Sequence, residues 1–343
     1  MRRVVVHRPG GYARLVVEDA PDVVPREGEV TIDVEAAGVN YADCMVRMGL
    51  YASARKYVGW PITPGFEVAG RVRAVGAGTT GFSVGEEVFA VTRFGGYASQ
   101  LCVPAHQVFR PPRGWTAVQA AGFPTVFLTA YHALFHLAHA RRDDVILVHS
   151  AAGGVGGALV QLGKLRGCRV VGVVGGTHKV EAVRELGAHH VIDKSREDLW
   201  SAARRQAPEG YDVVLDANGV STLRESFNHL RPTGRLVVYG FHSMIPRRGG
   251  KPDWLKLAWD WLRTPRFNPL DMTGTNRSVM AFNLSYLFER ADLLDEAMRD
   301  LMRWVDEGKI HPLKVTTYPL ASVADAHRDL ESGKTVGKLV LVT

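Results

Sequence analysis

Short apolar segments, broken by polar positions and separated by Gly, Pro and Asn, fill the first 120 residues and are typical of a β-rich unit. The strands that this pattern predicts span residues 4–7, 15–18, 29–37, 69–75, 87–91 and 97–103. Helical segments follow at residues 116–121 and 127–136.

The pattern changes after residue 123, where wholly apolar runs begin to alternate with helical segments. We expect strands at 145–149, 169–174, 190–193, 212–216 and 235–239. The helices between them span 155–165, 178–186, 195–204 and 221–230. This alternation predicts βαβ units and a parallel sheet, because parallel strands are joined by crossover helices. Strands that are apolar along their whole length fit a sheet covered on both faces.

Residues 242–277 interrupt the alternation with a basic stretch at 246–251 and a Trp-rich helical segment at 253–263. Helices at 293–305 and 324–330 and a strand at 338–342 follow. We expect this tail to return to the first unit, whose sheet edge needs cover. The chain then divides into a β-rich first part (1–122), an α/β unit with the insertion (123–270), and the last strand of that unit with the returning tail (271–343).

Composition agrees with an ordinary globular protein of two or three domains: 343 residues, 46% hydrophobic and 22% charged. The net charge of +7 comes from scattered basic residues, so we expect no nucleic-acid partner. Cys44, Cys102 and Cys168 are too few and too widely spaced for a disulfide scaffold and fit a reducing compartment. We find no signal-peptide pattern and no membrane-length apolar run, and we expect a cytoplasmic protein.

A Gly-rich string follows the apolar run at 145–149 and precedes a helix. Within it, Ala151, Gly153 and Gly156 keep the spacing of the G-x-G-x-x-G pattern, with Ala in the first place. Such a turn brings a pyrophosphate to backbone N–H groups at a helix N-terminus. The string predicts a dinucleotide site; a turn used only for packing is the alternative. The residues expected at the phosphates are Ala152, Gly153, Gly154, Val155 and Gly156.

The end of the second strand of this unit indicates which nicotinamide cofactor binds. An NAD site places an acid there for the ribose hydroxyls, but residues 173–180 contain no acid, and the first one after the strand is Glu181. Gly175 leaves room for a 2′-phosphate, and Thr177 and Lys179 can donate to it. We therefore expect NADP(H), with a solvated helix position as the alternative for Lys179.

Several strings resemble the medium-chain dehydrogenase/reductase superfamily, and its quinone oxidoreductase branch in particular, over nearly the whole chain. They are residues 38–43, 64–70 and 128–131 and the closing Gly337-Lys338. Residues 148–156 and 282–287 and the Trp-rich insertion are most similar to the vesicle amine transport protein homologues of that branch. The resemblance implies an α/β architecture, with a GroES-like β-rich catalytic domain, a Rossmann domain with a doubly wound parallel sheet, and an active site between them.

Zinc alcohol dehydrogenases of this superfamily have Cys where this chain has Asn40 and His where it has Phe66. Catalytic zinc needs three protein ligands with N, S or O donors, and an amide and a phenyl group remove two. The structural-zinc cysteines are also missing, since residues 87–110 hold only Cys102. We expect no metal. His132, His136 and His139 share helical spacing and are more typical of core or surface positions.

The resemblance implies that Asn40, Asp43 and Tyr51 line the place of the hydride acceptor. Each has an alternative role: Asn40 could bond backbone groups in a turn, Asp43 could cap a helix or pair with Arg47, and Tyr51 could be a lid aromatic. Met45 stands where bacterial quinone reductases have Tyr, so that tyrosine has no counterpart here.

Further cofactor contacts are implied by segments that pass the nicotinamide in relatives or that end strands on the cofactor side of the sheet. They are Thr125, Thr129, Asn218, Tyr239, Phe241, Phe282, Leu284 and Lys338. A helix-interior threonine bonded to its own backbone is the alternative for Thr129.

We expect an NADPH-dependent, zinc-independent oxidoreductase that transfers a hydride to a quinone or an α,β-unsaturated carbonyl. It would form a homodimer through a Rossmann edge strand such as 235–239. One alternative is a nucleotide-binding protein with weak or no catalysis that binds a lipid or protein partner. A second is an enoyl-thioester reductase with a basic groove. The insertion could be a helix packed over the cleft, a lid, or a contact for a membrane surface or partner.

Overall fold

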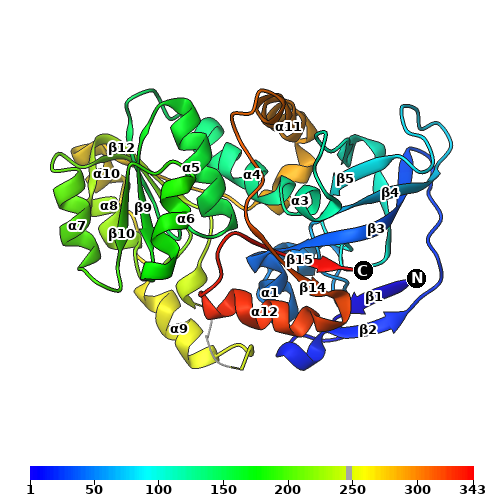
Figure 1. Cartoon of the computed structure of the whole chain (residues 1–343). Helices are drawn as coiled ribbons and strands as arrows, with labels where there is room; N and C mark the ends of the chain where they lie inside the picture. Colours follow the sequence, from blue (N-terminus) through cyan, green and yellow to red (C-terminus); the bar gives the residue numbers. More distant parts are fainter. Residues whose placement is uncertain (245–248) are drawn as a thin grey trace.

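The computed structural model describes residues 1–244 and 249–343, so Pro246 and the basic residues Arg247 and Arg248 lie outside the described residues. Two large sheets divide the molecule: a sheet in the half that holds both termini, and a parallel sheet in the other half (Figure 1). A separate antiparallel pair consists of β1 (Arg2–Val5) and β2 (Val16–Asp19).

The sheet in the terminal half runs in the order β14-β15-β3-β4-β5-β7, with β6 paired to β3. The last strand of the chain pairs antiparallel with β3, with Leu339 opposite Val39. The returning tail thus adds its strands to the sheet of the first half. The bounds are β3 (Glu29–Val39), β4 (Glu67–Val75), β5 (Glu87–Val91), β6 (Gln100–Pro104), β7 (Val108–Phe109), β14 (Val315–Pro319) and β15 (Lys338–Val342).

The second sheet has six parallel strands in the order β10-β9-β8-β11-β12-β13. Helices α5 and α6 pack on one side of it, in front in Figure 1, while α7 and α8 lie further back. The doubly wound parallel sheet predicted from the sequence is confirmed. Its strands are β8 (Val145–Val148), β9 (Arg169–Val174), β10 (His190–Asp193), β11 (Tyr211–Asp216), β12 (Leu230–Val238) and β13 (Ser278–Ala281).

The sequence-based choice of an edge strand at 235–239 is wrong. Those residues belong to β12, which lies between β11 and β13. Among the strands of this sheet that the structure describes, β10 and β13 form the edges. The last strand of this unit, expected within 271–343 without exact bounds, is the short β13, which only four residues make up (Ser278–Ala281).

The α-helices, in chain order, are α1 (Tyr41–Met48), α2 (Ala52–Tyr57), α3 (Ala117–Ala121), α4 (Pro124–Tyr131), α5 (Gly154–Arg166), α6 (Val180–Glu185), α7 (Leu199–Gln206), α8 (Leu223–Asn228), α9 (Trp254–Arg263), α10 (Pro269–Thr275), α11 (Ala291–Asp306) and α12 (Val323–Ser332). The short 3₁₀ helices are η1 (Tyr12–Arg14), η2 (Ala105–Gln107), η4 (Thr177–Lys179), η5 (His242–Met244), η6 (Leu284–Glu289) and η7 (Leu320–Ser322), and η3 (His132–Leu137) is a π-helical turn. The pattern did not predict α1, α2 or α10. The helix expected at 221–230 ends at Asn228 because β12 begins at Leu230.

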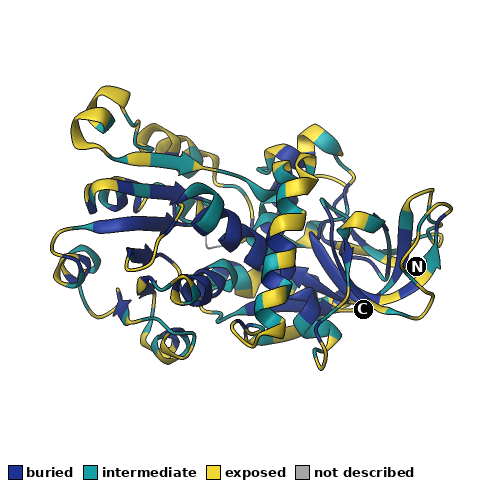
Figure 2. Cartoon of the chain, turned by 90° about the horizontal axis from the view of Figure 1, so that it is seen from above, coloured by how far each residue is buried: buried dark blue, intermediate teal, exposed yellow. Residues whose placement is uncertain are grey.

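One hydrophobic core joins the two halves. Phe123 and Phe127 from α3–α4, Leu159 from α5 and Leu301 from α11 belong to the same buried cluster. Figure 2 shows buried strands at the centre of each half and exposed helical surfaces around them. Because this core is shared, the position of the Gly-rich turn relative to β3 and β15 is fixed by packing.

Candidate active site

The Gly-rich turn joins β8 to α5. Gly153 is the N-cap of α5 and has no side chain to occupy the N–H groups of the first turn, which leaves those donors for an anion. A Cβ on Gly156 would lie 2.2 Å from the carbonyl oxygen of Ser150, so only glycine fits there. A Cβ on Gly153 would meet nothing closer than 3.4 Å, which leaves its surface approachable. The turn therefore has the form that a pyrophosphate requires.

The strand order reverses between β8 and β11, where ligands of such sheets bind. Across this point the hydroxyl of Ser150 donates to Oδ1 of Asn218 at 2.9 Å. Asp216 holds the same loop by accepting from the backbone N–H groups of Asn218 and Gly219. The hydroxyl of Tyr239, at the end of β12, is shielded from solvent and finds no hydrogen-bond partner among the described residues. An unsatisfied donor at this edge fits a cofactor with polar groups.

The end of β9 contains both cations and a carboxylate. Lys179 is 8% exposed, so it is not a solvated helix position, and its ammonium donates to the carbonyl of Gly333 at 2.7 Å. Burial, followed by the charge of Lys194, lowers the pKa of Lys179. The hydroxyl of Thr177 donates to Asp193 at 2.6 Å. β9 itself carries no acid at this end, but the adjacent strand β10 supplies one.

Asn40 is the N-cap residue of α1 and forms a capping box with Asp43, and its side chain also bonds two other side chains. Its Nδ2 donates to Oε1 of Glu67 at 2.8 Å, and its Oδ1 accepts from the ammonium of Lys338 at 2.5 Å. Lys338 also forms an ion pair with Glu67 at 2.6 Å, and both side chains are buried. The other oxygen of Glu67 accepts from the backbone N–H of Thr125 at 2.8 Å. We call Asn40, Glu67 and Lys338 the amide–ion-pair cluster.

Asp43 supports the start of α1. One carboxylate oxygen accepts from the backbone N–H of Asn40 at 2.8 Å and the other from that of Gly65 at 2.7 Å. The side chain is completely buried, and burial raises the pKa of Asp43 to about 7, while these two hydrogen bonds lower it. Of the alternatives considered for Asp43, the structure shows the one in which it caps a helix. Arg47 pairs with Glu331 at 2.7 Å rather than with Asp43.

Tyr51 lies before α2 and contacts the other half of the molecule. Its hydroxyl donates to Oδ1 of Asn283, in the segment after β13, at 2.7 Å. Its ring meets Phe66 edge-on at 5.7 Å, and Phe66 meets Phe94 at 5.3 Å. Burial raises the pKa of the Tyr51 phenol. Tyr51, Phe66 and Phe94 therefore form an aromatic group, and Phe66 directly precedes Glu67 of the amide–ion-pair cluster in the chain.

The remaining predicted cofactor residues fall in several surroundings. Thr129 donates to the carbonyl of Thr125 at 2.7 Å, which is the backbone-bonded alternative. Phe282 packs against His132 at 4.7 Å, and Leu284 begins η6. Phe241 is 43% exposed and lies against Gly219. In the Gly-rich turn the carbonyl of Ala152 accepts from the backbone N–H of Gly337 at 2.8 Å, and Gly154 and Val155 are the first residues of α5. A Cβ built on Gly175 would lie 3.7 Å from Cε of Lys194.

The residues at the candidate zinc position do not fit a metal. Asn40 and Phe66 offer an amide and a phenyl group, and the nearby carboxylate of Glu67 is already neutralised by the ammonium of Lys338. His132 and His136 bond each other through their Nδ1 atoms at 3.0 Å, and burial lowers the pKa of His132 to about 4.

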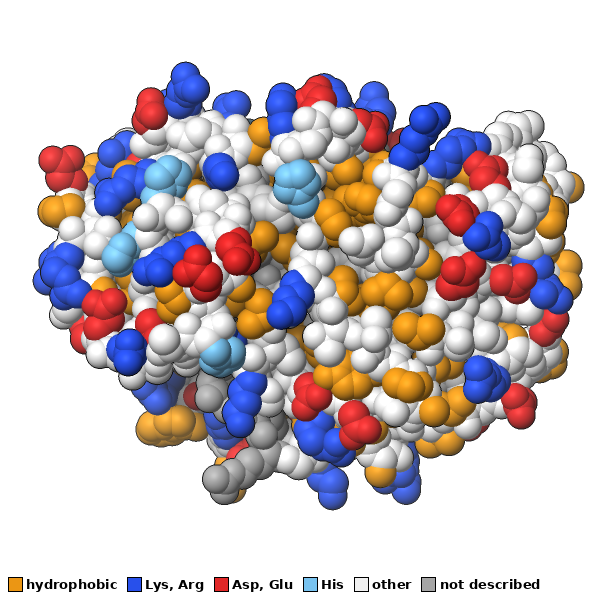
Figure 3. All heavy atoms as spheres, viewed as in Figure 1, with side chains coloured by type: hydrophobic (Ala, Val, Ile, Leu, Met, Phe, Trp, Pro, Cys, Tyr) orange, Lys and Arg blue, Asp and Glu red, His pale blue; other side chains and the backbone are white. Residues whose placement is uncertain are grey.

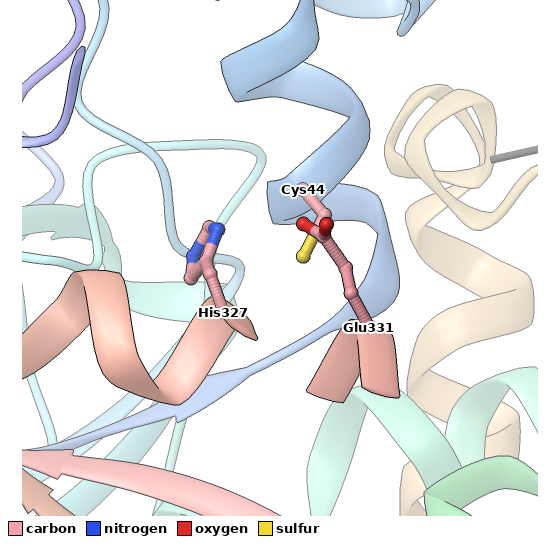
Figure 4. Close-up of side chains that lie close together, drawn as sticks. All are labelled: Cys44, His327 and Glu331. Atoms are coloured by element: carbon pink, nitrogen blue, oxygen red, sulfur yellow. The ribbon is translucent and has the colours of Figure 1, made fainter. Parts of the chain in front are cut away.

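One other group has metal-ligand chemistry among the residues that the structure describes. Cys44 on α1 and His327 and Glu331 on α12 place possible ligand atoms within 4.8 Å of one another (Figure 4). The guanidinium of Arg47 bonds both Glu331, at 2.7 Å, and His327, at 3.0 Å. Arg47 therefore supplies the positive charge in this group, and an additional divalent cation would be repelled.

Three polar residues of this region were not recognised in the sequence: Glu67, Lys194 and Asn283. Glu67 and Asn283 lie inside the strings that carried the resemblance, at 64–70 and 282–287. A buried carboxylate inside such a string is a usable signal, because an acid in an otherwise apolar run needs a partner.

Comparisons with known proteins agree with this geometry. A family model described as alcohol dehydrogenase GroES-like domain matches residues 26–113, and one described as zinc-binding dehydrogenase matches residues 186–341. A synaptic vesicle membrane protein VAT-1 homolog from Danio rerio is 35% identical, over 100% of this chain and 70% of that protein. A 2-haloacrylate reductase from Burkholderia sp is 32% identical, over 98% of each chain.

Solved structures also match over the whole chain. A quinone oxidoreductase from Escherichia coli, complexed with NADPH, superposes with a TM-score of 0.86 at 27% identity, covering 100% of both chains. The human VAT-1 homolog-like protein gives a TM-score of 0.83 at 29% identity, covering 100% of this chain and 98% of the other. The chain belongs to the medium-chain dehydrogenase/reductase family of oxidoreductases, as the sequence resemblance predicts.

Proposed function

We propose that the chain reduces a quinone or an α,β-unsaturated carbonyl with NADPH and without zinc. The observation that carries this proposal is the amide–ion-pair cluster. It occupies the region where zinc-dependent relatives hold their metal, and it adjoins the Gly-rich turn through Lys338, whose Cδ is 3.6 Å from a Cβ built on Gly154. A site with a polar amide, a phenolic hydroxyl and no metal suits hydride transfer to an electron-poor acceptor.

NADPH is supported by the open Gly-rich turn, by Lys179 and Lys194 near the end of β9, and by the NADPH complex of the E. coli quinone oxidoreductase. When bound, the nicotinamide supplies the hydride. Thr177 and Lys179 would donate to the 2′-phosphate, and the N–H groups at Gly153–Val155 would hold the pyrophosphate. The polar atoms of Asn218 and Tyr239 lie at the same edge of the sheet, where the nicotinamide ribose would bind.

The chain's own groups would act on the acceptor oxygen. Hydride addition to the β-carbon of an enone places a negative charge on the carbonyl oxygen. A proton from water would then add to the α-carbon of this enolate or, for a quinone, to the oxygen of the hydroquinone anion. The amide of Asn40 would stabilise this charge as a hydrogen-bond donor. The hydroxyl of Tyr51 has one proton, which it donates to Asn283 at rest, so it would donate to the acceptor by exchanging that bond. Asp43 would act by fixing the backbone at Asn40, since both of its oxygens are occupied by backbone donors.

The test is NADPH oxidation by purified protein with a quinone, a neutral enone and a 2-haloacrylate, the last chosen because of the Burkholderia relative. We expect turnover with NADPH well above that with NADH, unchanged by a chelator, and reduced in Tyr51→Phe. NADPH binding without turnover of any of these acceptors would overturn the reductase assignment. Activity that depends on zinc would overturn the proposal that the reaction proceeds without a metal.

We further propose a homodimer joined through β13, the edge strand that follows the interior strand β12. Sedimentation of the wild type and of Val279→Pro, which removes a backbone donor at this edge, tests the proposed dimer.

A cytoplasmic location is also part of the proposal, and it is supported by the three free cysteines, Cys44, Cys102 and Cys168. No helix among residues 1–244 and 249–343 is long and apolar enough to cross a bilayer.

A second candidate function, binding to an anionic lipid surface, is favoured by the orientation of α9. Its charged pair, Lys256 and Asp260, faces the protein, and Lys256 also donates to the carbonyl of Ser243 at 2.6 Å. The large apolar residues of α9 and the following α10 face outward. They are Trp254, Leu255, Trp259, Trp261, Leu262 and Leu270, each at least 60% exposed. A small hydrophobic group projects at the lower left of Figure 3, near the place of α9 in Figure 1.

Exposed Lys251, Arg263 and Arg266 border this apolar face, a combination that suits anionic headgroups. Elsewhere on the face in Figure 3, positive and negative side chains are interspersed. We expect the protein to sediment with vesicles that contain phosphatidylserine, less with purely zwitterionic vesicles, and about tenfold less in Trp254→Ala/Trp261→Ala. Val24→Ala, at an exposed apolar site in the other half, is the control. Equal binding to the phosphatidylserine-containing and the zwitterionic vesicles would contradict the proposal that the basic residues recognise anionic headgroups.

A further inference from the structure

The amide–ion-pair cluster leaves only one orientation for the side-chain amide of Asn40. A lysine ammonium can only donate hydrogen bonds, and a carboxylate can only accept them. Lys338 faces Oδ1 of Asn40 at 2.5 Å, and Glu67 faces Nδ2 at 2.8 Å. Rotating the amide by half a turn would point its NH₂ group at the ammonium and its oxygen at the carboxylate, so both contacts would become repulsive.

The surrounding chain is built to admit this pair. A Cβ on Gly38 would lie 2.3 Å from Oε1 of Glu67, and one on Gly122 would lie 3.1 Å from Cγ of Lys338. Glu67 is fully buried and Lys338 is 3% exposed. Ionic groups this deeply buried are costly unless paired, and their pairing gives little net stability over apolar residues. A role beyond stability accounts better for their presence.

We propose that Glu67 and Lys338 are positioning residues that fix the Asn40 amide for catalysis. One N–H of Asn40 is held by Glu67, and no second acceptor bonds Nδ2 among the residues that the structure describes, so the other N–H remains for the oxygen of the hydride acceptor. The orientation is set before the acceptor binds, so no reorganisation is needed when charge develops on that oxygen. This inference rests on the proposed reductase function for its kinetic consequence, but the fixed orientation belongs to the resting protein.

The critical variant is the double substitution Glu67→Gln/Lys338→Met. Each single change, Glu67→Gln or Lys338→Met, leaves one buried charge without its partner and is expected to lower stability strongly. The double variant holds no lone charge, so most of the stability should return. Its glutamine can both donate and accept, so it no longer distinguishes the two amide orientations. We expect kcat to stay about 10- to 100-fold below wild type, while the unfolding temperature recovers.

Two further variants sharpen the result. Lys338→Arg keeps a donor-only cation, so its kcat should stay within about tenfold of wild type. Lys314→Met removes an exposed lysine from the segment beside β15 and should change nothing. If kcat in the double variant recovers together with stability, the pair is only structural and the proposal fails. If the Kd for NADPH rises while kcat at saturation is unchanged, Lys338 acts on the cofactor instead, which also overturns the proposal.

A measurement on the resting protein separates this inference from the proposed function. The chain has six asparagines, so ¹⁵N-asparagine labelling gives six side-chain NH₂ signals, and Asn40→Ala identifies the one from Asn40. We expect its two protons to be widely separated in chemical shift, because one is bonded to a carboxylate, and this separation to collapse in the double variant. An unchanged spectrum in that variant refutes the fixed orientation, whether or not the wild type turns over any acceptor.

Discussion

The hydroxyl of Tyr51 donates to Oδ1 of Asn283 at 2.7 Å, across the junction of the two halves of the molecule. The same oxygen accepts from the N–H and the hydroxyl of Ser285, at 3.0 and 2.9 Å. Asn283 thus organises both the start of η6 and the loop that carries Tyr51. The phenol proposed to meet the acceptor is held in place by a residue from the other half.

This bond predicts a measurable coupling. Tyr51→Phe and Asn283→Ala should each cost about 1 kcal/mol of stability, and the double variant should cost little more than either single one. A double-mutant cycle from urea unfolding measures this. Tyr318→Phe, which loses a tyrosine–carboxylate bond to Asp329 elsewhere, is the control and should be additive with Asn283→Ala. Additive losses for the Tyr51–Asn283 pair would mean that the bond contributes nothing to joining the halves.

Asp43 predicts a specific dependence of stability on pH. Its folded-state pKa of about 7 lies above the value near 4 of an unfolded aspartate, so the folded protein binds the proton more tightly. Stability from this group is fully present below about pH 4 and is lost as pH rises to about 7. Over three pKa units this amounts to about 4 kcal/mol, at 1.4 kcal/mol per unit.

The difference in unfolding free energy between wild type and Asp43→Asn isolates this contribution, because buried histidines such as His327 and His149 titrate equally in both. We expect wild type to lose its stability relative to Asp43→Asn as pH rises from 4 to 7. Urea unfolding at several pH values measures the difference. A constant difference over this range would mean that Asp43 remains ionised in the folded protein.

The parallel sheet could be predicted from the sequence because its strands are uniformly apolar and regularly spaced. The helix α1 could not, because it is short and its charged residues Asp43 and Arg47, four residues apart on one face, are both buried rather than exposed to solvent. The edge strand β13 was expected only as a last strand somewhere within 271–343, because four residues give too little pattern to set its bounds. β12 was chosen as the edge because the expected last strand lies 40 residues further on, beyond a segment of different character, and its pairing with β12 could not be predicted.

The site was predicted only in part, for a related reason. The Gly-rich turn is local and could be read from spacing alone. The amide–ion-pair cluster is not local: Glu67 is 27 residues from Asn40, and Lys338 is 298 residues away. They meet because β15 pairs with β3 in the returned tail. Lys338 was assigned to the cofactor from its place in the closing motif, whereas in the folded chain its ammonium bonds Glu67 and Asn40.

Lys179 should decide the preference between the two nicotinamide cofactors. Its ammonium donates to the carbonyl of Gly333 in the resting protein, and burial lowers its pKa, so a 2′-phosphate would offer a stronger, charged partner. We expect Lys179→Gln to raise the Kd for NADPH about 10- to 100-fold and the Kd for NADH less than about threefold, as expected for loss of one charge-assisted hydrogen bond. Calorimetric titration measures both. Lys309→Gln, which replaces an exposed lysine elsewhere in the chain, is the control and should change neither Kd. An equal loss of affinity for both cofactors would exclude a contact with the 2′-phosphate.

Gly156 and Gly274 form a matched pair for testing the Gly-rich turn. Both lie in helices, but a Cβ on Gly156 would be 2.2 Å from the carbonyl oxygen of Ser150, and a Cβ on Gly274 would meet nothing within 4 Å. Gly156→Ala should therefore cost about 2–3 kcal/mol and abolish NADPH binding, because α5 must move away from β8. Gly274→Ala should stabilise the protein by about 0.5–1 kcal/mol, through the better helix propensity of alanine. Urea unfolding and NADPH fluorescence measure the two effects. If Gly156→Ala binds NADPH normally, then the close approach of helix and strand is not what holds the phosphate-binding turn in shape.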